Sequence, residues 1–265
     1  MRDSHEADVQ GGEGGTAMTT PEIVDSADIA APGHLDSAWF SDGGRVIDDM
    51  STVLAAFGVI RETGLAATLP EISNIGVHQT ASGVIQDPAG SAVGARSLSG
   101  GGASGAIYST FADLLPIPNM RVGAAVFNRS TGLGRRVLHT YSPQLRGGPA
   151  SADDRSSALV ALATAYANAL LAVAARAGEL GADGELCNLV PISGAIFAGG
   201  FRRERFFATA HLDPSYTLVA LVVAVAYVRA QRASVPPLTL CYFATDVARR
   251  AIEVRDSMHA TLVSA

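Results

Sequence analysis

The pattern of apolar and polar positions divides the chain into a polar leader and a longer region of alternating elements. Residues 1–38 are rich in Gly, Ser, Thr, Asp and Glu and show no sustained apolar period, which is typical of a segment without its own core. Residues 39–265 carry the hydrophobic patterns, with no internal repeat and no sign of a second core. We therefore expect a disordered acidic leader over residues 1–38 and one folded domain over residues 39–265.

Apolar residues recur at helical spacing in several places. From Arg45 to Glu62 the pattern predicts one amphipathic helix. Ser157–Ala177 is apolar on all sides, which predicts a largely buried helix. Asp153 or Asp154 is the expected N-cap of that helix. Further helices are expected over Ala103–Leu115, Arg203–Leu212, Ser215–Gln231 and Val247–Val263.

Short apolar runs between these helices predict strands. Leu186–Ile192 is a continuous apolar run, as expected for the middle of a parallel sheet that is buried on both faces. Strands that alternate with helices indicate an open α/β sheet, in which ligands bind outside the carboxyl ends of the strands. The other expected strands are Ile72–Val77, Gly83–Ile85, Ser91–Ala95, Gly123–Asn128, Arg136–Tyr141 and Leu238–Phe243, with a turn over Asp87–Gly90.

Two glycine-containing loops follow predicted strands. The first lies in Arg96–Tyr108, where three consecutive glycines allow several backbone N–H groups to converge on one point. A helix that begins there would direct its free N–H groups and positive dipole end at the same point, which favours phosphate. The second loop is Ser193–Gly200. Each loop therefore predicts an anion site, with a flexible surface turn as the alternative.

Composition and charge restrict the classes of function. Hydrophobic residues make up 48% of the 265 residues, which is enough for a sizeable core. The net charge of -6 argues against a nucleic-acid partner, which needs a basic face. The N-terminus has no apolar signal-peptide core, and the most apolar window, Leu218–Val228, is about half as long as a membrane-spanning helix. Cys187 and Cys241 are expected to be buried free thiols. We therefore expect an intracellular protein, in cytoplasm or nucleus, with no DNA or membrane partner.

Two nucleotide-binding motifs compete for the first glycine loop. A Walker loop is excluded because no Lys followed by Ser or Thr comes after Gly100–Gly105. Gly100, Gly102 and Gly105 match the glycine spacing of a dinucleotide-binding Rossmann unit. The acidic residue that such a unit needs about 20 residues later is not present, so this alternative is weak.

Few side chains suggest catalysis. His139 lies within a predicted strand, so we expect a structural hydrogen-bonded histidine, with a general base as the alternative. Ser104 and Ser193 have no evident base in the sequence, which disfavours a nucleophile. His78 and His211 show no metal-ligand spacing. The sequence therefore predicts no catalytic residue, no metal and no cofactor.

Four segments, taken in order, resemble the macro-domain family. Arg96–Tyr108 resembles the family's loop, in which a leucine and a spacer precede three glycines and Gly-Ala-Ile begins a helix. Val137–Pro143 is similar to the family's strand of the type V-I-H-T-V-G-P, and Tyr166 lies within a long helix, as a tyrosine does in the family. Pro191–Gly199 resembles the second loop, P-x-I-S-T-G-I-F-G. The resemblance covers about residues 80–245 and implies a three-layer α/β/α fold with a mixed, mostly parallel sheet.

The family binds ADP-ribose, and some members hydrolyse ADP-ribosyl linkages or O-acetyl-ADP-ribose. The resemblance implies that the two loops hold the diphosphate and the distal ribose through backbone N–H groups. Phe197 is a candidate to cover that ribose, and Phe243 is a candidate to stack on adenine. The implied ligand-binding residues are Gly100, Gly101, Gly102, Ala103, Ser104, Ser193, Gly194, Ala195, Ile196, Phe197 and Phe243.

The chain departs from the family where the family's hydrolysis resides. Counting back from Gly100 places Ala92–Ala95 at the family's N-A-A-N, so the asparagine that orients the distal ribose is absent. The adenine-binding aspartate would fall near Ala81 and is also absent, unless Asp87 takes its place. Ala195 adds a methyl group to the second loop. We therefore expect a divergent domain that binds ADP-ribose or a related nucleotide diphosphate, with little or no hydrolysis. The alternatives are a hydrolase that acts on ADP-ribosylated protein and a ligand-free scaffold for a protein partner.

Overall fold

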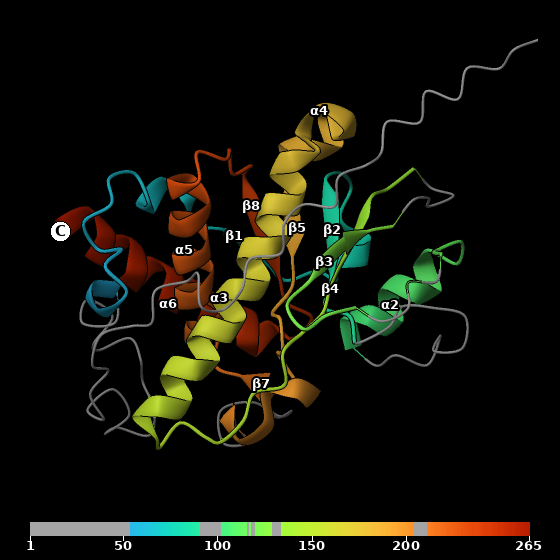
Figure 1. The fold of residues 1–265 in the computed structure, drawn as a ribbon. Coiled ribbons are helices and arrows are strands. Elements are labelled where there is room, and N and C mark those ends of the chain that lie inside the picture. The colour runs from blue at the N-terminus through green and yellow to red at the C-terminus, as the bar shows by residue number, and fades with distance from the viewer. Residues whose placement is uncertain (1–53, 91–101, 116, 118–119, 129–133, 204–210) are drawn as a thin grey trace, which may run out of the picture.

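The computed structural model describes residues 54–90, 102–115, 117, 120–128, 134–203 and 211–265 (Figure 1). The predicted leader, the start of the helix Arg45–Glu62 and the predicted strand Ser91–Ala95 lie outside these residues. The division of the chain at residue 38 therefore stays a prediction.

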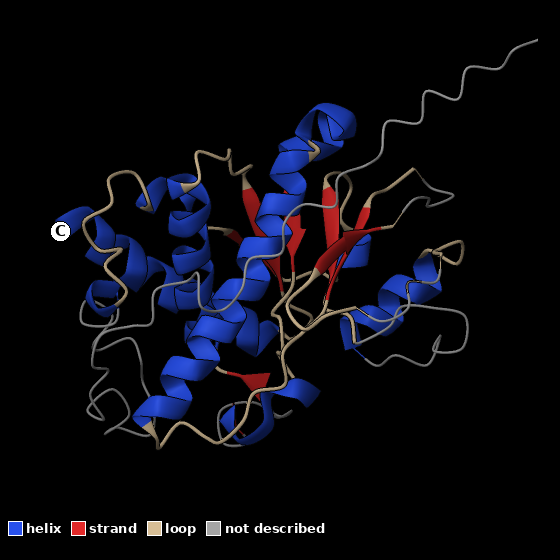
Figure 2. Ribbon diagram, in the orientation of Figure 1, coloured by secondary structure: helices blue, strands red, loops and turns tan. Residues whose placement is uncertain are grey.

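A six-stranded sheet forms the centre of the molecule (Figure 1, Figure 2). Its strand order is β1-β8-β5-β2-β4-β3, and β3 is antiparallel to its neighbour while the other pairs are parallel. The strands are β1 (Glu71–Ser73), β2 (Val84–Asp87), β3 (Ala125–Phe127), β4 (Val137–Thr140), β5 (Cys187–Leu189) and β8 (Leu238–Cys241). This arrangement confirms the predicted mixed, mostly parallel sheet.

Helices cover both faces of the sheet. Successive strand residues point to opposite faces, and apolar residues on each face form a separate core with the helices that cover it. Val84 and Leu189 belong to one core, and Ile85 and Val190 belong to the other. The first core lies under the helices α3, α5 and α6, and the second lies under α2. The predicted three layers are therefore present. The bounds are α2 (Gly102–Thr110), α3 (Ala152–Ala175), α4 (Ala177–Leu180), α5 (Pro214–Ala230) and α6 (Thr245–Ser264), with short 3-10 turns η3 (Ala66–Thr68), η4 (Val77–Gln79), η5 (Gly181–Glu185) and η6 (Ile196–Phe201).

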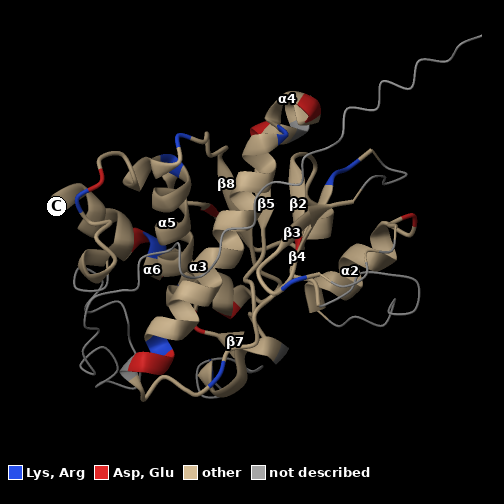
Figure 3. Cartoon of the chain, viewed as in Figure 1, with Lys and Arg blue, Asp and Glu red and all other residues tan. Residues whose placement is uncertain are grey.

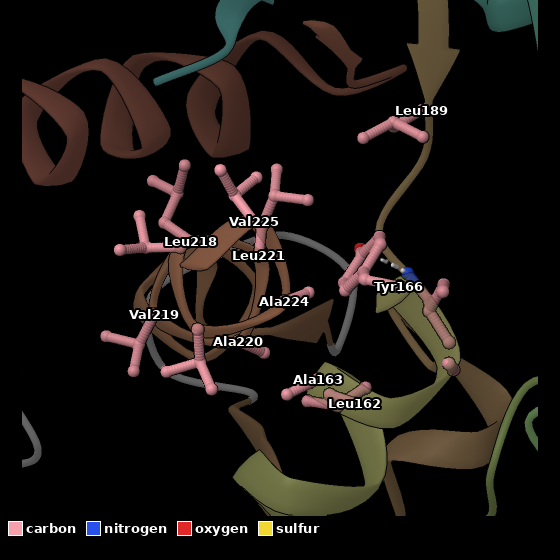
Figure 4. Close-up of a cluster of buried hydrophobic side chains, with 14 of the residues drawn as sticks. Leu162, Ala163, Tyr166, Leu189, Leu218, Val219, Ala220, Leu221, Ala224 and Val225 are labelled. Carbon is pink, nitrogen blue, oxygen red and sulfur yellow. Dashed lines mark hydrogen bonds between the residues drawn. The ribbon is translucent and has the colours of Figure 1, made fainter. Parts of the chain in front are cut away.

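The packing of α3 against α5 forms the largest part of the core (Figure 4). Small residues such as Ala163 and Ala220 let the two helices approach closely, and Leu162 and Leu221 fill the space beside them. By length and composition α3 is able to cross a membrane, but 72% of its apolar window is buried within the fold. Its apolar surface is thus largely covered by α5 and the sheet, as the uniformly apolar pattern predicted.

The first turn of α3 differs from the prediction. Ser151 is the N-cap, and its hydroxyl accepts a hydrogen bond from the backbone N–H of Asp154 at 3.2 Å. The predicted cap at Asp153 or Asp154 is therefore wrong. Asp153 and Asp154 lie two and three positions after this cap, within the first helical turn, where the positive end of the helix dipole stabilises them.

Replacing Ser151 with alanine is expected to lower the free energy of unfolding by about 1 kcal/mol, because the N–H of Asp154 loses its acceptor. Urea denaturation followed by circular dichroism measures this change. Ser157→Ala is the matched control, because Ser157 is an exposed residue inside the same helix. The control is expected to be neutral or slightly stabilising, and an equal loss in both variants would contradict the capping role.

Two predicted elements are wrong in type. Val77 lies in the 3-10 turn η4, so the predicted strand Ile72–Val77 is limited to β1. The predicted helix Arg203–Leu212 is not helical at its described ends, since β6 (Arg202–Arg203) pairs antiparallel with β7 (His211–Leu212). In both cases hydrogen bonding within the folded chain overrides a weak local pattern.

Two predicted helices are shorter than expected. Residues 54–56 are helical, and the chain then turns at Gly58, whose φ of +72° ends the helix well before Glu62. The helix α2 ends at Thr110 rather than at Leu115. The strand that precedes the first glycine loop in the described chain is β2, which ends at Asp87.

Candidate functional site

A cavity of about 510 Å³ lies at the carboxyl ends of the central strands. Pro88 follows β2, Ser142 lies just after β4, Pro191 just after β5 and Tyr242 directly after β8, and all of them line the cavity. In an open α/β sheet this edge is the usual place for a ligand, because the loops between strands and helices gather there.

The two predicted loops border this one cavity. Gly102, Ala103 and Ser104, at the start of α2, lie on one side, and the described part of the second loop lies on the other. The predicted residues that line the cavity are Gly102, Ala103, Ser104, Ser193, Gly194, Ala195, Phe197 and Phe243. Ile196 begins η6, and its side chain, like Gly100 and Gly101, lies outside what the structure describes. Contact of any of these residues with a ligand stays a prediction.

The second loop is held by hydrogen bonds within the protein. Ser193 has a φ of +55°, and the N–H of Gly194 donates to the carbonyl of Pro191 at 3.2 Å. A Cβ at position 194 would lie 2.9 Å from that carbonyl oxygen, so the turn requires glycine there. The Ser193 hydroxyl donates to the carbonyl of Pro143 and has no second proton to offer a ligand.

Tyr166 fixes the chain between β5 and the second loop. Its buried hydroxyl donates to the carbonyl of Val190 and accepts from the N–H of Ile192, both at 3.0 Å. Figure 4 shows the Tyr166 ring reaching the chain beyond Leu189. Burial raises the pKa of the Tyr166 hydroxyl, so the donor proton is retained. Tyr166, a residue of α3, thereby holds the backbone of Val190 and of Ile192, on either side of Pro191, in place.

Behind the first loop lies a buried carboxylate that the sequence analysis placed in a turn. Asp87 is the last residue of β2 and is fully buried. Its Oδ1 accepts from the Ser104 hydroxyl at 2.6 Å, and its Oδ2 accepts from the Tyr108 hydroxyl at 2.7 Å. The Nδ1 of His139 also lies 2.7 Å from Oδ2. Both oxygens of Asp87 are thus engaged, and Asp87 is not among the described residues that line the cavity, so its carboxylate offers nothing to a ligand there. The predicted turn does begin at Asp87, whose backbone carbonyl accepts from the N–H of Ala89 at 2.9 Å.

His139 is neutral in this arrangement. The side-chain amide of Asn128 is oriented by the backbone of Leu115, whose N–H donates to Oδ1 and whose carbonyl accepts from Nδ2. The same Nδ2 lies 3.1 Å from the Nε2 of His139, which must therefore be the unprotonated nitrogen. Nδ1 then carries the proton and donates it to Asp87. His139 is a structural hydrogen-bonded histidine, as the sequence predicted.

The cluster holds one negative charge, on Asp87. Burial, and next the charge of Asp87, raises the pKa of the Tyr108 hydroxyl, so Tyr108 remains a donor. Three donors already occupy the oxygens of the carboxylate, so its contact with Ser104 does not create an activated nucleophile. The sequence analysis missed this contact. Its one visible sign is the four-residue spacing of Ser104 and Tyr108, which places both side chains on one face of α2.

Charged side chains are scarce around the cavity. Figure 3 shows Lys, Arg, Asp and Glu mainly at the ends of the helices and in outer loops. None of the described residues that line the cavity is Lys, Arg, Asp or Glu. Ser142 lines it as well, with a buried hydroxyl that has no hydrogen-bond partner within the described chain. The described residues hold no group of three side chains suited to a metal ion.

Both cysteines are buried free thiols, as predicted. Burial raises the pKa of the Cys187 thiol and of the Cys241 thiol to about 12. At neutral pH both are therefore protonated. Cys241 contributes to the cavity wall as an apolar group.

Phe243 lies at the end of the cavity that is formed by β8. It is 51% exposed, and its ring stacks on that of His78 with 5.9 Å between centroids and 20° between planes. A Cβ at Gly76 would lie within 3 Å of both rings, so the glycine lets them sit directly over the backbone. Phe243 therefore presents a half-exposed aromatic ring at the cavity.

No protein-family model matches the chain, and no curated protein matches it. Among solved structures, the chain is similar to "Alphavirus P23pro-zbd", with 17% identity, a TM-score of 0.49, and coverage of 78% of this chain but 26% of that one. The chain thus spans about a quarter of that protein's length. It is also similar to two mutants of the Oceanobacillus iheyensis macrodomain, one of them with ADPR, at 16% identity and a TM-score of 0.46, covering 70% of this chain and 90% or 89% of theirs. Solved macrodomains are thus among the structures similar to this chain.

Proposed function

We propose that the cavity binds ADP-ribose or a related nucleotide diphosphate, with weak or no hydrolysis. The observation that carries this proposal is that two glycine-containing loops, about 90 residues apart in the chain, border one cavity of about 510 Å³. That volume lies within the usual range of small-molecule sites. Backbone N–H groups at a glycine-containing turn can hold a pyrophosphate without a cationic side chain, which suits a lining without Lys or Arg.

The strand order suggests how the ligand lies. β8, β5 and β2 are neighbours in the sheet, about 4.8 Å apart from one to the next. Phe243 follows β8, the loop with Ser193 follows β5, and α2 with Ser104 is the first described helix after β2. An adenine on Phe243 would therefore place the diphosphate at Ser193–Phe197 and the terminal ribose toward Ser104.

The lining supports binding over hydrolysis. General-base catalysis needs a titratable group within hydrogen-bond reach of the attacking water. The described lining includes no carboxylate, and the carboxylate of Asp87 is buried behind Ser104 with both oxygens occupied. The lining does include the imidazole of His211, which is the candidate general base for the hydrolase alternative.

Calorimetric titration of the full chain with ADP-ribose tests the proposal. Micromolar binding, with no release of ADP-ribose from ADP-ribosylated protein, is the expected result. Release at a catalytic rate would establish the hydrolase alternative. Absence of heat and of any thermal stabilisation at millimolar ADP-ribose would overturn the proposal and favour the ligand-free scaffold.

Replacing Phe243 with alanine is expected to weaken ADP-ribose binding roughly tenfold, because a stacked base is worth a few kcal/mol at most when its aromatic partner is removed. The fold is expected to be unaffected, since the ring is 51% exposed. Val122→Ala is the matched control, because Val122 is 60% exposed and does not line the cavity. Equal affinities of F243A and the control would show that the base lies elsewhere.

A further inference from the structure

The hydroxyl of Ser104 has only lone pairs to offer the cavity. A serine hydroxyl has one proton to donate and accepts through its oxygen. The Oγ of Ser104 lies 2.6 Å from Oδ1 of Asp87 and 3.3 Å from the carbonyl oxygen of Pro88, and both of these partners are acceptors. The proton of Ser104 therefore points into the protein in either case. Ser104 is half-buried and lines the cavity, so its oxygen faces the ligand as an acceptor.

The cluster behind Ser104 fixes this direction. Tyr108 and the neutral His139 both donate to Asp87, which leaves the aspartate as an acceptor with its negative charge in place. The carboxylate has no exposed surface, so water does not screen it as it screens a surface charge. An anionic oxygen beside the Ser104 hydroxyl would find no donor in that side chain and would be repelled by the Asp87 carboxylate. A neutral group that has a proton to donate, such as a sugar hydroxyl, can instead form a hydrogen bond with the Ser104 oxygen.

We propose that Ser104 is a specificity residue of this site, which accepts a hydrogen bond from a sugar hydroxyl of the ligand, while the Asp87 carboxylate disfavours phosphate at the same place. The inference rests on the proposed function and refines it. It divides the cavity into a region for the diphosphate, at the second loop, and a region for a neutral sugar, at the start of α2. A nucleoside diphosphate that carries a sugar is then preferred over a nucleoside triphosphate.

ADP-ribose and ATP form a matched pair of probes, because they share the ADP moiety and differ in the ribose or phosphate attached to it. The wild-type chain is expected to bind ADP-ribose more tightly than ATP in calorimetric titration. Ser104→Ala is expected to weaken ADP-ribose binding roughly 3- to 10-fold, the usual effect of one lost neutral hydrogen bond, and to leave ATP binding unchanged. Ser109→Ala is the matched control, because Ser109 lies on the same helix, is exposed and bonds the carbonyl of Gly105.

Asp87→Asn tests the charge and the proton direction together. The asparagine oxygen would accept from Tyr108 and His139, and its NH₂ group would then donate to the Ser104 oxygen. The proton of Ser104 is then no longer held by residue 87 and is shared between the carbonyl of Pro88 and a ligand acceptor, and the negative charge is removed. ATP binding is expected to strengthen, and the preference for ADP-ribose over ATP to fall roughly tenfold. A thermal unfolding curve with a single cooperative transition confirms that the variant is folded.

Each outcome separates the two proposals. If the wild-type chain does not bind ADP-ribose, the proposed function fails and this inference fails with it. If the wild-type chain binds ADP-ribose and Ser104→Ala does not weaken that binding, or weakens ATP binding equally, only the inference is overturned. An unchanged ligand preference in a folded Asp87→Asn variant would contradict the role of the carboxylate.

Discussion

Replacing Asp87 with alanine is expected to lower the free energy of unfolding by about 3–5 kcal/mol, the range seen when one partner of a buried polar pair is removed. The change leaves the Tyr108 hydroxyl and the Nδ1–H of His139 without an acceptor, and both residues are buried, Tyr108 on α2 and His139 in β4. Ser104 is half-buried and can turn to the carbonyl of Pro88, so its share of the loss is smaller.

Urea denaturation of the wild-type and variant chains measures this effect. Asp113→Ala is the matched control, because Asp113 is an exposed aspartate just beyond the same helix, and its loss is expected to stay within about 0.5 kcal/mol. A loss of less than about 1 kcal/mol for Asp87→Ala would mean that the donors find other acceptors, which would contradict the closed cluster described here.

Tyr166 is expected to give the second large effect. Tyr166→Ala removes a fully buried aromatic ring between α3 and β5 and is expected to cost about 3–5 kcal/mol of unfolding free energy. Tyr166→Phe keeps the ring and leaves the carbonyl of Val190 and the N–H of Ile192 unpaired, which is expected to cost about 1–3 kcal/mol.

The pair of variants separates packing from hydrogen bonding, and both are measured by the same denaturation assay. Because the hydroxyl sets the backbone around Pro191, Tyr166→Phe is also expected to speed hydrogen exchange of the amides of the second loop. A phenylalanine variant as stable as the wild-type chain, with unchanged exchange, would show that the loop is held by other contacts.

Much of the fold was predictable because the strongest patterns are those of buried elements. The apolar run that contains β5 and the uniformly apolar pattern of α3 indicated structures with both faces covered, and both are buried. The pairing of Arg202–Arg203 with His211–Leu212 was not predictable, since two-residue strands leave no periodic signal and their partner is set by the folded chain. Ser151 was missed as a cap because two aspartates beside it suit the same role.

The site was predictable to a similar degree. That the two loops share one cavity followed from their positions after parallel strands, whose carboxyl ends meet at one edge. The Asp87 cluster was not predictable, because it depends on the neighbour and the register of β2. Asp87 lies directly opposite His139 only because β2 pairs with β4 in this register. Neither the choice of β4 as the neighbour of β2 nor this register can be predicted from the residues of one strand alone.

That alignment makes the buried carboxylate a check on strand pairing. A slip of one residue between β2 and β4 would carry the partner side chain to the opposite face of the sheet. Asp87 would then lose the Nδ1–H of His139, one of its three donors, at a place with no exposed surface, and a buried carboxylate that lacks a donor is costly. Burying the charge of Asp87 is unfavourable by itself, but it makes the native register of β2 and β4 more stable than a register shifted by one residue.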